Sequence, residues 1–416
     1  MFRLVLLVGY LIVSFESLAQ DKIIAIQFKG IDKTKEVYIN KFIDTQIGDE
    51  PDTAKIHREI NRLTNLEMFG DVSYQLDVTD EGLVLTYVFK ELFTLLPIVN
   101  FGSLTNNFWF QLGTSDVNLL GMGHKFYAYY QYYDRSSVAV HLNLIRIKCT
   151  QWDVNFNYIK WSTLEPLFFD AGEVFYNYDN YTYGADLVHH FNFNNSLLFG
   201  GAFFTEEYTA TSTLVEGAPS YAFEKKMLLK LIFKHQQIKQ HYFQLWGYTN
   251  QLTLQHVRSF SDYPLFFIGY NDFKYYKKIR EKGNLAVRLR LGLSSNNNSP
   301  FAPFVLDSYL NIRGVGNRVD RGTGTLVLNA EYRHSLLNKQ KLALQLVAFM
   351  DTGTWRTPGG GFDDFMMYEN QEYFGGLGIR FIHKKIHNAI LRIDYGADFK
   401  GASGSNGIVI GLGQYF

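Results

Sequence analysis

The chain has 416 residues, and its 40 basic and 40 acidic residues give a formal net charge of zero. This balance removes the electrostatic argument for a nucleic-acid partner. The chain is 47% hydrophobic and 17% aromatic, yet beyond its first residues no apolar run is long enough to cross a bilayer as a helix. With Cys149 as the only cysteine, no intramolecular disulfide is expected.

The first segment, residues 1–19, reads as a secretory signal peptide. Arg3 provides a positive start, residues 4–15 are mostly apolar, and residues 17–19 form a small-x-small cleavage site. The apolar run is too short for a confident membrane-spanning helix. We therefore expect cleavage before Gln20, with an uncleaved anchor as the alternative.

A small α+β domain is predicted over residues 20–92. Asp52 is a plausible N-cap for a helix whose apolar residues recur at helical spacing and which we expect to end at Gly70. Residues 79–82 form a good hairpin turn. The expected elements are a strand, two helices and two strands, over residues 22–28, 33–44, 53–69, 71–78 and 83–89.

The helical period disappears after residue 93. Strand-like stretches of about ten residues recur between polar turns, and residues 138–147 and 341–351 alternate apolar and mixed side chains. Such alternation is typical of a transmembrane β-barrel, in which lipid-facing and lumen-facing side chains alternate. The sequence therefore predicts a mainly β fold, with a transmembrane antiparallel β-barrel of about 16 strands over residues 93–416.

The end of the chain repeats this alternation. A final strand that ends in Phe resembles the signal that bacterial barrels present to their assembly machinery. On such a strand, every second side chain lies on the same face, and the residues expected on this face are Ile408, Ile410, Leu412 and Phe416.

A Gly-rich, non-periodic segment at about residues 300–324 contains Arg313 and Gly314. An arginine on a loop and an aspartate on a following strand suggest that the loop folds back into the barrel. Charges that faced lipid would cost a few kcal/mol each near the midplane, so we expect the charged side chains of the following strands to face the lumen. The lumen-facing residues by parity are Asn329, Glu331, Arg333, Phe349, Asp351 and Gly353.

These segments resemble the signature segments of the BamA/TamA superfamily, and residues 20–92 resemble a POTRA domain. The matching segments are Ile312-Arg313-Gly314, Asn329-x-Glu331-x-Arg333, Phe349-x-Asp351-x-Gly353, Asp116-x-Asn118-Leu119-Leu120-Gly121-x-Gly123 and Gly376-x-Gly378-x-Arg380. The resemblance covers the whole mature chain.

The resemblance implies that the loop lies in the lumen and that Arg313 pairs with a wall carboxylate. Asp351 is the first choice by position and Glu331 the second, because a guanidinium fork suits a carboxylate. Gly314 would let the loop approach the wall closely. Val315 stands where the family usually has an aromatic residue, which leaves the packing of the loop tip open.

The resemblance also implies a bacterial outer-membrane protein with its POTRA domain in the periplasm. Such a protein inserts β-barrel clients or translocates polypeptide. Its expected partners are unfolded outer-membrane or secreted polypeptides, which would bind the POTRA strand edge and the barrel seam by β-augmentation, together with outer-membrane lipid and accessory subunits. The alternatives are a secretion pore dedicated to one partner protein and a passive channel.

No enzyme, cofactor or metal site is expected. The segment at residues 401–405 lacks the final Gly of a Gly-x-Ser-x-Gly motif. His189 and His190 are adjacent, so on a strand they would point to opposite faces and make a poor metal pair. The Gly-rich segments are not followed by helical patterns, which argues against phosphate binding.

Overall fold

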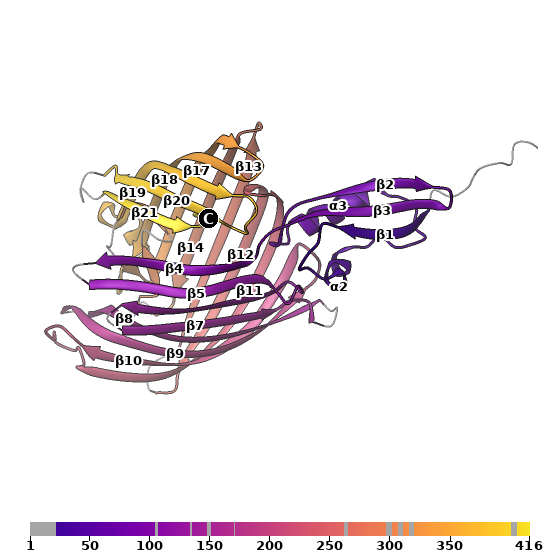
Figure 1. Cartoon of the computed structure of the whole chain (residues 1–416). Coiled ribbons are helices and arrows are strands. Elements are labelled where there is room, and N and C mark those ends of the chain that lie inside the picture. Colours follow the sequence, from indigo (N-terminus) through magenta and orange to yellow (C-terminus); the bar gives the residue numbers. More distant parts are fainter. Residues whose placement is uncertain are drawn as a thin grey trace, which may run out of the picture.

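The computed structural model describes residues 22–416 except 105–106, 134, 148–150, 170, 262–264, 297–301, 307–310, 316–319 and 401–405. The predicted signal peptide and Cys149 lie outside the described residues. Figure 1 shows a small domain at the N-terminal end of the chain and a large curved sheet built from the rest. In the described part of the chain, no helix has the length and apolar composition that crossing a membrane requires.

The small domain combines a three-stranded sheet with two helices, in the predicted order. The sheet has the order β1-β3-β2, in which β1 is parallel and β2 antiparallel to the central strand β3. The elements are β1 (Ile23–Lys29), α2 (Glu36–Ile39), the 3-10 helix η1 (Asn40–Phe42), α3 (Thr53–Thr64), β2 (Phe69–Thr79) and β3 (Gly82–Glu91).

Helix α3 begins as predicted and ends earlier than predicted. The Asp52 side chain accepts hydrogen bonds from the backbone N–H groups of Ala54 and Lys55, at 2.8 and 3.0 Å, as an N-cap does. The expected end at Gly70 is wrong, because Gly70 lies in β2. Phe69 is already a buried strand residue, and its ring packs 4.7 Å from that of Phe89.

The first helix is also shorter than the predicted span of residues 33–44. The carboxylate of Glu91, at the end of β3, accepts hydrogen bonds from the backbone N–H groups of Lys33 and Thr34. These bonds hold the chain in a non-helical conformation before Glu36, where α2 begins.

A buried carboxylate, which the sequence did not point out, joins the parts of this domain. Glu59 of α3 is fully buried and accepts hydrogen bonds from the backbone N–H groups of Asp44 and Thr45, each at 2.8 Å. The Tyr87 hydroxyl of β3 donates a further hydrogen bond to it. Burial, together with this neighbouring carboxylate, raises the pKa of Tyr87.

The large sheet has sixteen antiparallel strands among the described residues, which confirms the predicted mainly β fold and strand number. Neighbours in the sheet are neighbours in sequence, except that β14 pairs with β17. The strands are β4 (Leu95–Leu104), β5 (Asn107–Leu119), β6 (His124–Tyr133), β7 (Arg135–Leu144), β8 (Trp152–Phe169), β9 (Gly172–His190), β10 (Asn195–Ala210), β11 (Tyr221–His241), β12 (Gln244–Ser259), β13 (Phe266–Ile279), β14 (Gly283–Ser294), β17 (Gly324–Asn338), β18 (Leu342–Arg356), β19 (Gln371–His383), β20 (Ile390–Asp398) and β21 (Asn406–Leu412).

The sheet curls so that its first and last strands, β4 and β21, come to the same side of the molecule (Figure 1). Among the described residues, no backbone ladder joins these two strands. The connection between β14 and β17 contains a two-stranded pair, β15 (Phe304–Leu306) with β16 (Asp320–Gly322). The connection between β18 and β19 contains the short 3-10 helices η3 (Phe362–Met366) and η4 (Tyr368–Asn370).

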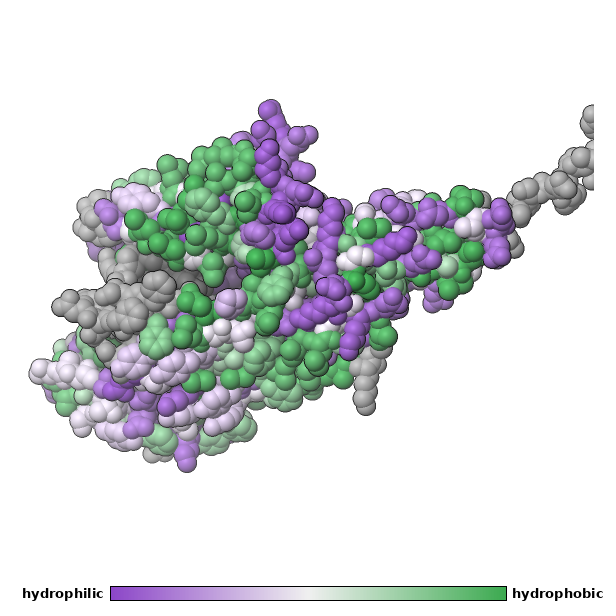
Figure 2. All heavy atoms as spheres, in the orientation of Figure 1, coloured by the Kyte–Doolittle hydropathy of each residue, from purple (hydrophilic) through white to green (hydrophobic). Residues whose placement is uncertain are grey.

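Side-chain parity follows the strand period. On β17, Leu326 and Leu328 are exposed on the outer face, whereas Asn329 and Glu331 are buried on the inner face. Figure 2 shows apolar side chains over the outside of the late strands and hydrophilic side chains where the sheet meets the small domain.

The segment at residues 116–123, one of those noted in the sequence, forms the joint between the two parts. Asp116 accepts a hydrogen bond from the Lys33 ammonium at 2.7 Å, and the Asn118 amide donates to the Thr34 hydroxyl at 2.8 Å. Gly121 has a φ of +71°, and a side chain there would collide with the backbone oxygen of Lys33. The small domain is therefore fixed against the strand ends by the partly buried Lys33–Asp116 pair and the buried Asn118–Thr34 hydrogen bond.

Candidate functional site

Arg313 lies in the connection between β14 and β17 and is fully buried. Its guanidinium donates two hydrogen bonds to the Asp351 carboxylate, from Nε to Oδ2 at 2.8 Å and from Nη2 to Oδ1 at 2.9 Å. The backbone N–H of Arg313 donates a third bond to Asp351 Oδ2 at 3.0 Å. The wall carboxylate thus holds both the side chain and the backbone of the loop.

Glu331, the second-choice partner, is also engaged. Arg313 Nη1 donates to Glu331 Oε2 at 2.5 Å, and Arg333 Nε donates to Glu331 Oε1 at 2.5 Å. The sequence left Asp351 and Glu331 as alternatives, and the structure places both against the one guanidinium. We call Arg313, Asp351 and Glu331 the loop lock.

Asn329 orients the carboxylate of the lock. It lies directly opposite Asp351 in the β17–β18 ladder, and its amide donates to Asp351 Oδ1 at 2.8 Å and to the backbone oxygen of Asn311 at 2.7 Å. The Arg288 guanidinium donates to the Asn329 oxygen at 3.0 Å. The predicted wall residue Asn329 therefore contacts the wall carboxylate and the loop backbone at once.

Two further charges complete the cluster. Asp394 of β20 receives two hydrogen bonds from Arg380 of β19, at 2.7 and 3.1 Å. Asp394 Oδ2 lies 3.9 Å from Arg313 Nη1, and Arg380 Nη2 lies 3.9 Å from Glu331. The buried arginines 313, 333 and 380 thus lie against the buried carboxylates 331, 351 and 394, as buried charges require opposite charges nearby.

Gly314 brings the loop backbone into contact with β20. Its φ is +99°, a region that residues with a Cβ rarely adopt. A Cβ at this position would lie 2.7 Å from the carbonyl carbon and oxygen of Gly396. The loop can reach the wall at this depth because both contact positions are glycine.

The loop tip packs without the family aromatic residue. Val315 is buried with Ile312 against Val327, Trp355 and Phe374. Aromatic rings reach Arg313 from elsewhere: its guanidinium lies 3.7 Å from the centre of the Phe349 ring and 4.2 Å from that of Tyr415. Gly353 is buried in β18, opposite Val327.

The C-terminus departs from the prediction. Ile408, Ile410 and Leu412 lie on the exposed face of β21, but β21 ends at Leu412, and Gly413 has a φ of +83°. The prediction that Phe416 continues this face is wrong. Phe416 is buried, its backbone oxygen accepts a hydrogen bond from Arg333 at 3.0 Å, and its ring lies 5.5 Å from the Arg288 guanidinium.

Some of this site was visible in the sequence and some was not. Arg380 belongs to one of the segments noted in the sequence, but no pattern linked it or Asp394 to Arg313. Tyr415 and Arg288 were missed, since the contact of Tyr415 depends on the turn at Gly413. Within the described residues, no group of three or more His, Cys, Asp or Glu side chains could hold a metal ion.

The described part of the chain thus forms a sixteen-stranded sheet with apolar side chains on its outer face and a loop bound to its inner face. No protein-family model matches the sequence, and no curated protein matches it. Among solved structures, the chain is similar to BamA from Haemophilus ducreyi lacking POTRA domains 1–3, with a TM-score of 0.53 and 15% identity, over 94% of this chain and 83% of that one.

Two structures of CdiB are similar as well. CdiB from Escherichia coli gives a TM-score of 0.59 at 12% identity, over 95% of this chain and 75% of that one. CdiB from Acinetobacter baumannii gives 0.57 at 12% identity, over 94% and 74%. The chain therefore has the fold of BamA and CdiB, which confirms the resemblance expected from its sequence segments.

Proposed function

We propose that this chain is a bacterial outer-membrane protein that inserts β-barrel clients or passes polypeptide across the membrane. The observation that carries the proposal is the loop lock, in which Arg313 of an interior loop is bound to Asp351 and Glu331 of the wall. A barrel whose interior loop is held by a buried ion pair is suited to a regulated opening. The BamA-like fold supports the same conclusion.

In this proposal the small domain is a POTRA domain and lies in the periplasm. Its sheet has two outer strands, β1 and β2, and in the described residues β2 pairs only with β3. The Gly70 oxygen at the start of β2 accepts from the Tyr242 N–H at 3.1 Å. Beyond it, the outer edge of β2 offers backbone groups to an extended client, which would add a strand by β-augmentation.

The second place for a client strand is the seam between β4 and β21. Backbone groups on the outer edges of these strands have no ladder partner among the described residues. The last strand has seven described residues, and a client strand of ordinary length could pair along them. Neither step requires a catalytic residue or a cofactor.

Secretion of one dedicated partner is the second candidate, because the fold is at least as similar to CdiB as to BamA. Depletion of the protein, followed by comparison of the outer-membrane and secreted proteomes, separates the two. Loss of many barrel proteins supports an insertase, and loss of one exported protein supports a dedicated transporter. If neither proteome changes, the proposal fails.

A passive channel is distinguished by conductance in planar bilayers. We expect the wild-type protein to be closed or weakly conducting and Arg313→Ala to conduct more, because its loop is released. Arg135→Ala removes an arginine from a partly exposed pair with Asp179 and is the matched control. A wild-type protein that is stably open and unchanged by Arg313→Ala would support the channel.

A further inference from the structure

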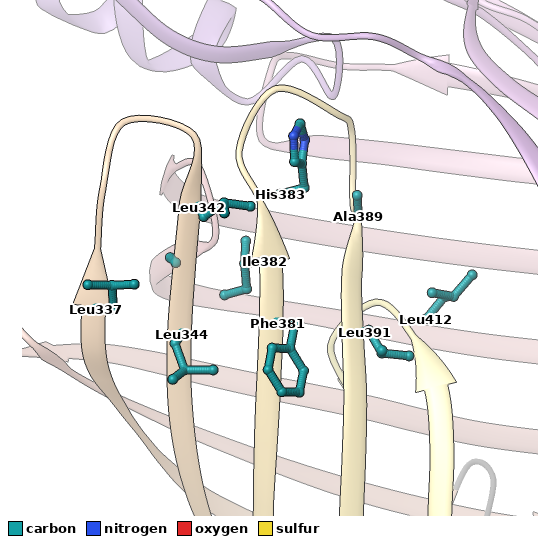
Figure 3. Close-up of a pocket in the computed structure, with 10 residues that line it drawn as sticks. Leu337, Leu342, Leu344, Phe381, Ile382, His383, Ala389, Leu391 and Leu412 are labelled. Carbon is teal, nitrogen blue, oxygen red and sulfur yellow. The ribbon is translucent and has the colours of Figure 1, made fainter.

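An apolar groove lies on the outer face of the last strands, beside the turns at the end that bears the small domain (Figure 3). It has a volume of about 470 Å³, within the range of roughly 300–1,000 Å³ that is usual for ligand sites. Its outward-facing lining comes from five successive strands and the adjoining turn, and includes Leu337, Leu344, Phe381, Ala389, Leu391 and Leu412.

The groove is bordered by a strongly basic rim. The β17–β18 turn contributes Lys339 and Lys341, and the β19–β20 turn contributes Lys384 and Lys385. The two turns lie side by side, because the backbone N–H of Lys384 donates to the Lys341 oxygen at 2.8 Å. Neither turn contains an acidic residue, so the rim carries an excess of positive charge.

Three of these ammonium groups are available to a ligand. Lys339, Lys341 and Lys385 are exposed, whereas Lys384 is committed to the protein. Its ammonium donates to the Asn338 side chain and the Lys339 backbone oxygen, each at 3.1 Å. Burial and the nearby cation of Lys90 lower the pKa of Lys384, although Asp71 opposes this.

A polar group at the upper end of the groove also lacks a partner. His383 lines the groove (Figure 3), and its buried Nδ1 has no hydrogen-bond partner within the part of the chain that the structure describes. A buried polar atom normally finds a partner. A hydroxyl or phosphate oxygen of a bound molecule would supply one at this place.

We propose that the groove and its rim bind one anionic phospholipid of the periplasmic leaflet, with an acyl chain between Phe381 and Leu391 and its phosphate against Lys339, Lys341 and Lys385. This inference rests on the membrane orientation of the proposed function. The apolar walls match a hydrocarbon chain, and lysines at the end of an apolar face lie where headgroup phosphates lie.

The site contacts both the segment that leads from the small domain and the last strand of the sheet. The β19–β20 turn is bonded to the start of the barrel, where Phe93 donates to the Lys385 oxygen at 3.0 Å and accepts from the His387 N–H at 2.9 Å. Leu412 of the last strand closes the other side of the groove. A bound lipid would therefore contact the turn that meets the small domain and the strand that borders the seam.

The test measures lipid retained by the purified full-length protein in detergent. Phosphatidylglycerol and phosphatidylcholine with identical acyl chains are added separately, and bound lipid is counted by native mass spectrometry. We expect clear preference for phosphatidylglycerol. The triple variant Lys339→Gln/Lys341→Gln/Lys385→Gln should lose affinity by about fivefold for each lysine, the factor that corresponds to a lysine near an anionic headgroup.

The matched control is Lys277→Gln/Lys278→Gln/Lys282→Gln, which removes the same charge from the end of β13 and from the β13–β14 turn, at the same end of the sheet. It should retain lipid as the wild type does. Ala389→Phe fills the groove without changing charge and should also release the lipid. Equal binding of both lipids, equal loss in both triple variants, or full retention by Ala389→Phe each overturns the proposal.

The outcome is independent of the client assay. Lipid retention is measured on purified protein, so its failure leaves the depletion experiment untouched. Conversely, if the lipid binds as expected while depletion changes neither proteome, this inference stands and the proposed function is rejected.

Discussion

Ion pairs on the late strands β17–β20 and the pair that joins the middle strands β7 and β9 lie in different surroundings. The side chains of Arg313, Asp351 and Glu331 have no exposed surface. Those of Arg135 and Asp179, 3.1 Å apart on β7 and β9, are 37% and 29% exposed. The inward loop and the C-terminal residues cover the first set, whereas the second set is partly exposed.

This difference in burial explains why ion pairs of the same kind contribute differently to stability within one sheet. An exposed pair contributes about 0–1 kcal/mol, because water solvates each partner when the other is lost. Removing one partner of a buried pair leaves an uncompensated charge, which costs about 3–5 kcal/mol. The buried ion pairs of the late strands therefore hold the loop firmly, whereas the Arg135–Asp179 pair contributes little to stability.

The largest expected effect follows the loss of the wall carboxylate. Asp351→Ala should lower the free energy of unfolding by about 3–5 kcal/mol, because Arg313 loses three of its hydrogen bonds in a buried site. Urea unfolding of the protein in lipid vesicles measures this. A change under about 1 kcal/mol would mean that the cluster is open to water.

The next effect concerns the backbone of the loop. Gly314→Ala should destabilise by about 1–2 kcal/mol through its positive φ, and further through collision with Gly396. Gly359→Ala is the control, since Gly359 has a φ of +80° and no atom within 4 Å of a Cβ. Equal thermal midpoints for the two variants would show that the loop does not contact β20.

A smaller effect is expected from the C-terminal aromatic. Tyr415→Leu removes the ring 4.2 Å from the Arg313 guanidinium and should destabilise by up to about 2 kcal/mol, the value for a desolvated cation–π contact. Tyr415→Phe keeps the ring and should change the midpoint of unfolding far less. If Tyr415→Phe lowers the midpoint of unfolding as much as Tyr415→Leu does, the hydroxyl group stabilises the protein and the ring contact does not.

The smallest effect belongs to the middle strands. Arg135→Gln should lower the free energy of unfolding by about 0.2–1 kcal/mol, and this loss should shrink as salt screens the exposed charges. The Asp351→Ala loss should change little with salt because its site is buried. If Arg135→Gln lowered the free energy of unfolding by more than about 2 kcal/mol at every salt concentration, the two regions would not differ as described.

The sequence predicted those parts of the molecule that depend on strand parity and on short local signals. Alternation placed Asp351, Glu331 and Asn329 on the inner face, and Asp52 marked the start of α3. The order of elements in the small domain and the number of strands in the large sheet followed from turn spacing.

What could not be predicted depends on contacts between distant segments. The turn at Gly413 directs Tyr415 and Phe416 into the interior, and no local pattern distinguishes it from a continued strand. Arg380 and Asp394 reach the lock only because β19 lies beside β18 and β20 lies beside β19. The basic rim likewise exists because two turns separated by more than forty residues in sequence lie side by side.

The central claim is that Arg313 and Asp351 form one buried unit that fixes the loop. A double-mutant cycle with Arg313→Ala, Asp351→Ala and the double variant, measured by urea unfolding in lipid vesicles, tests it most directly. We predict a coupling energy of about 2–5 kcal/mol, as for a buried, hydrogen-bonded pair. Additive losses, with coupling below about 0.5 kcal/mol, would contradict the account.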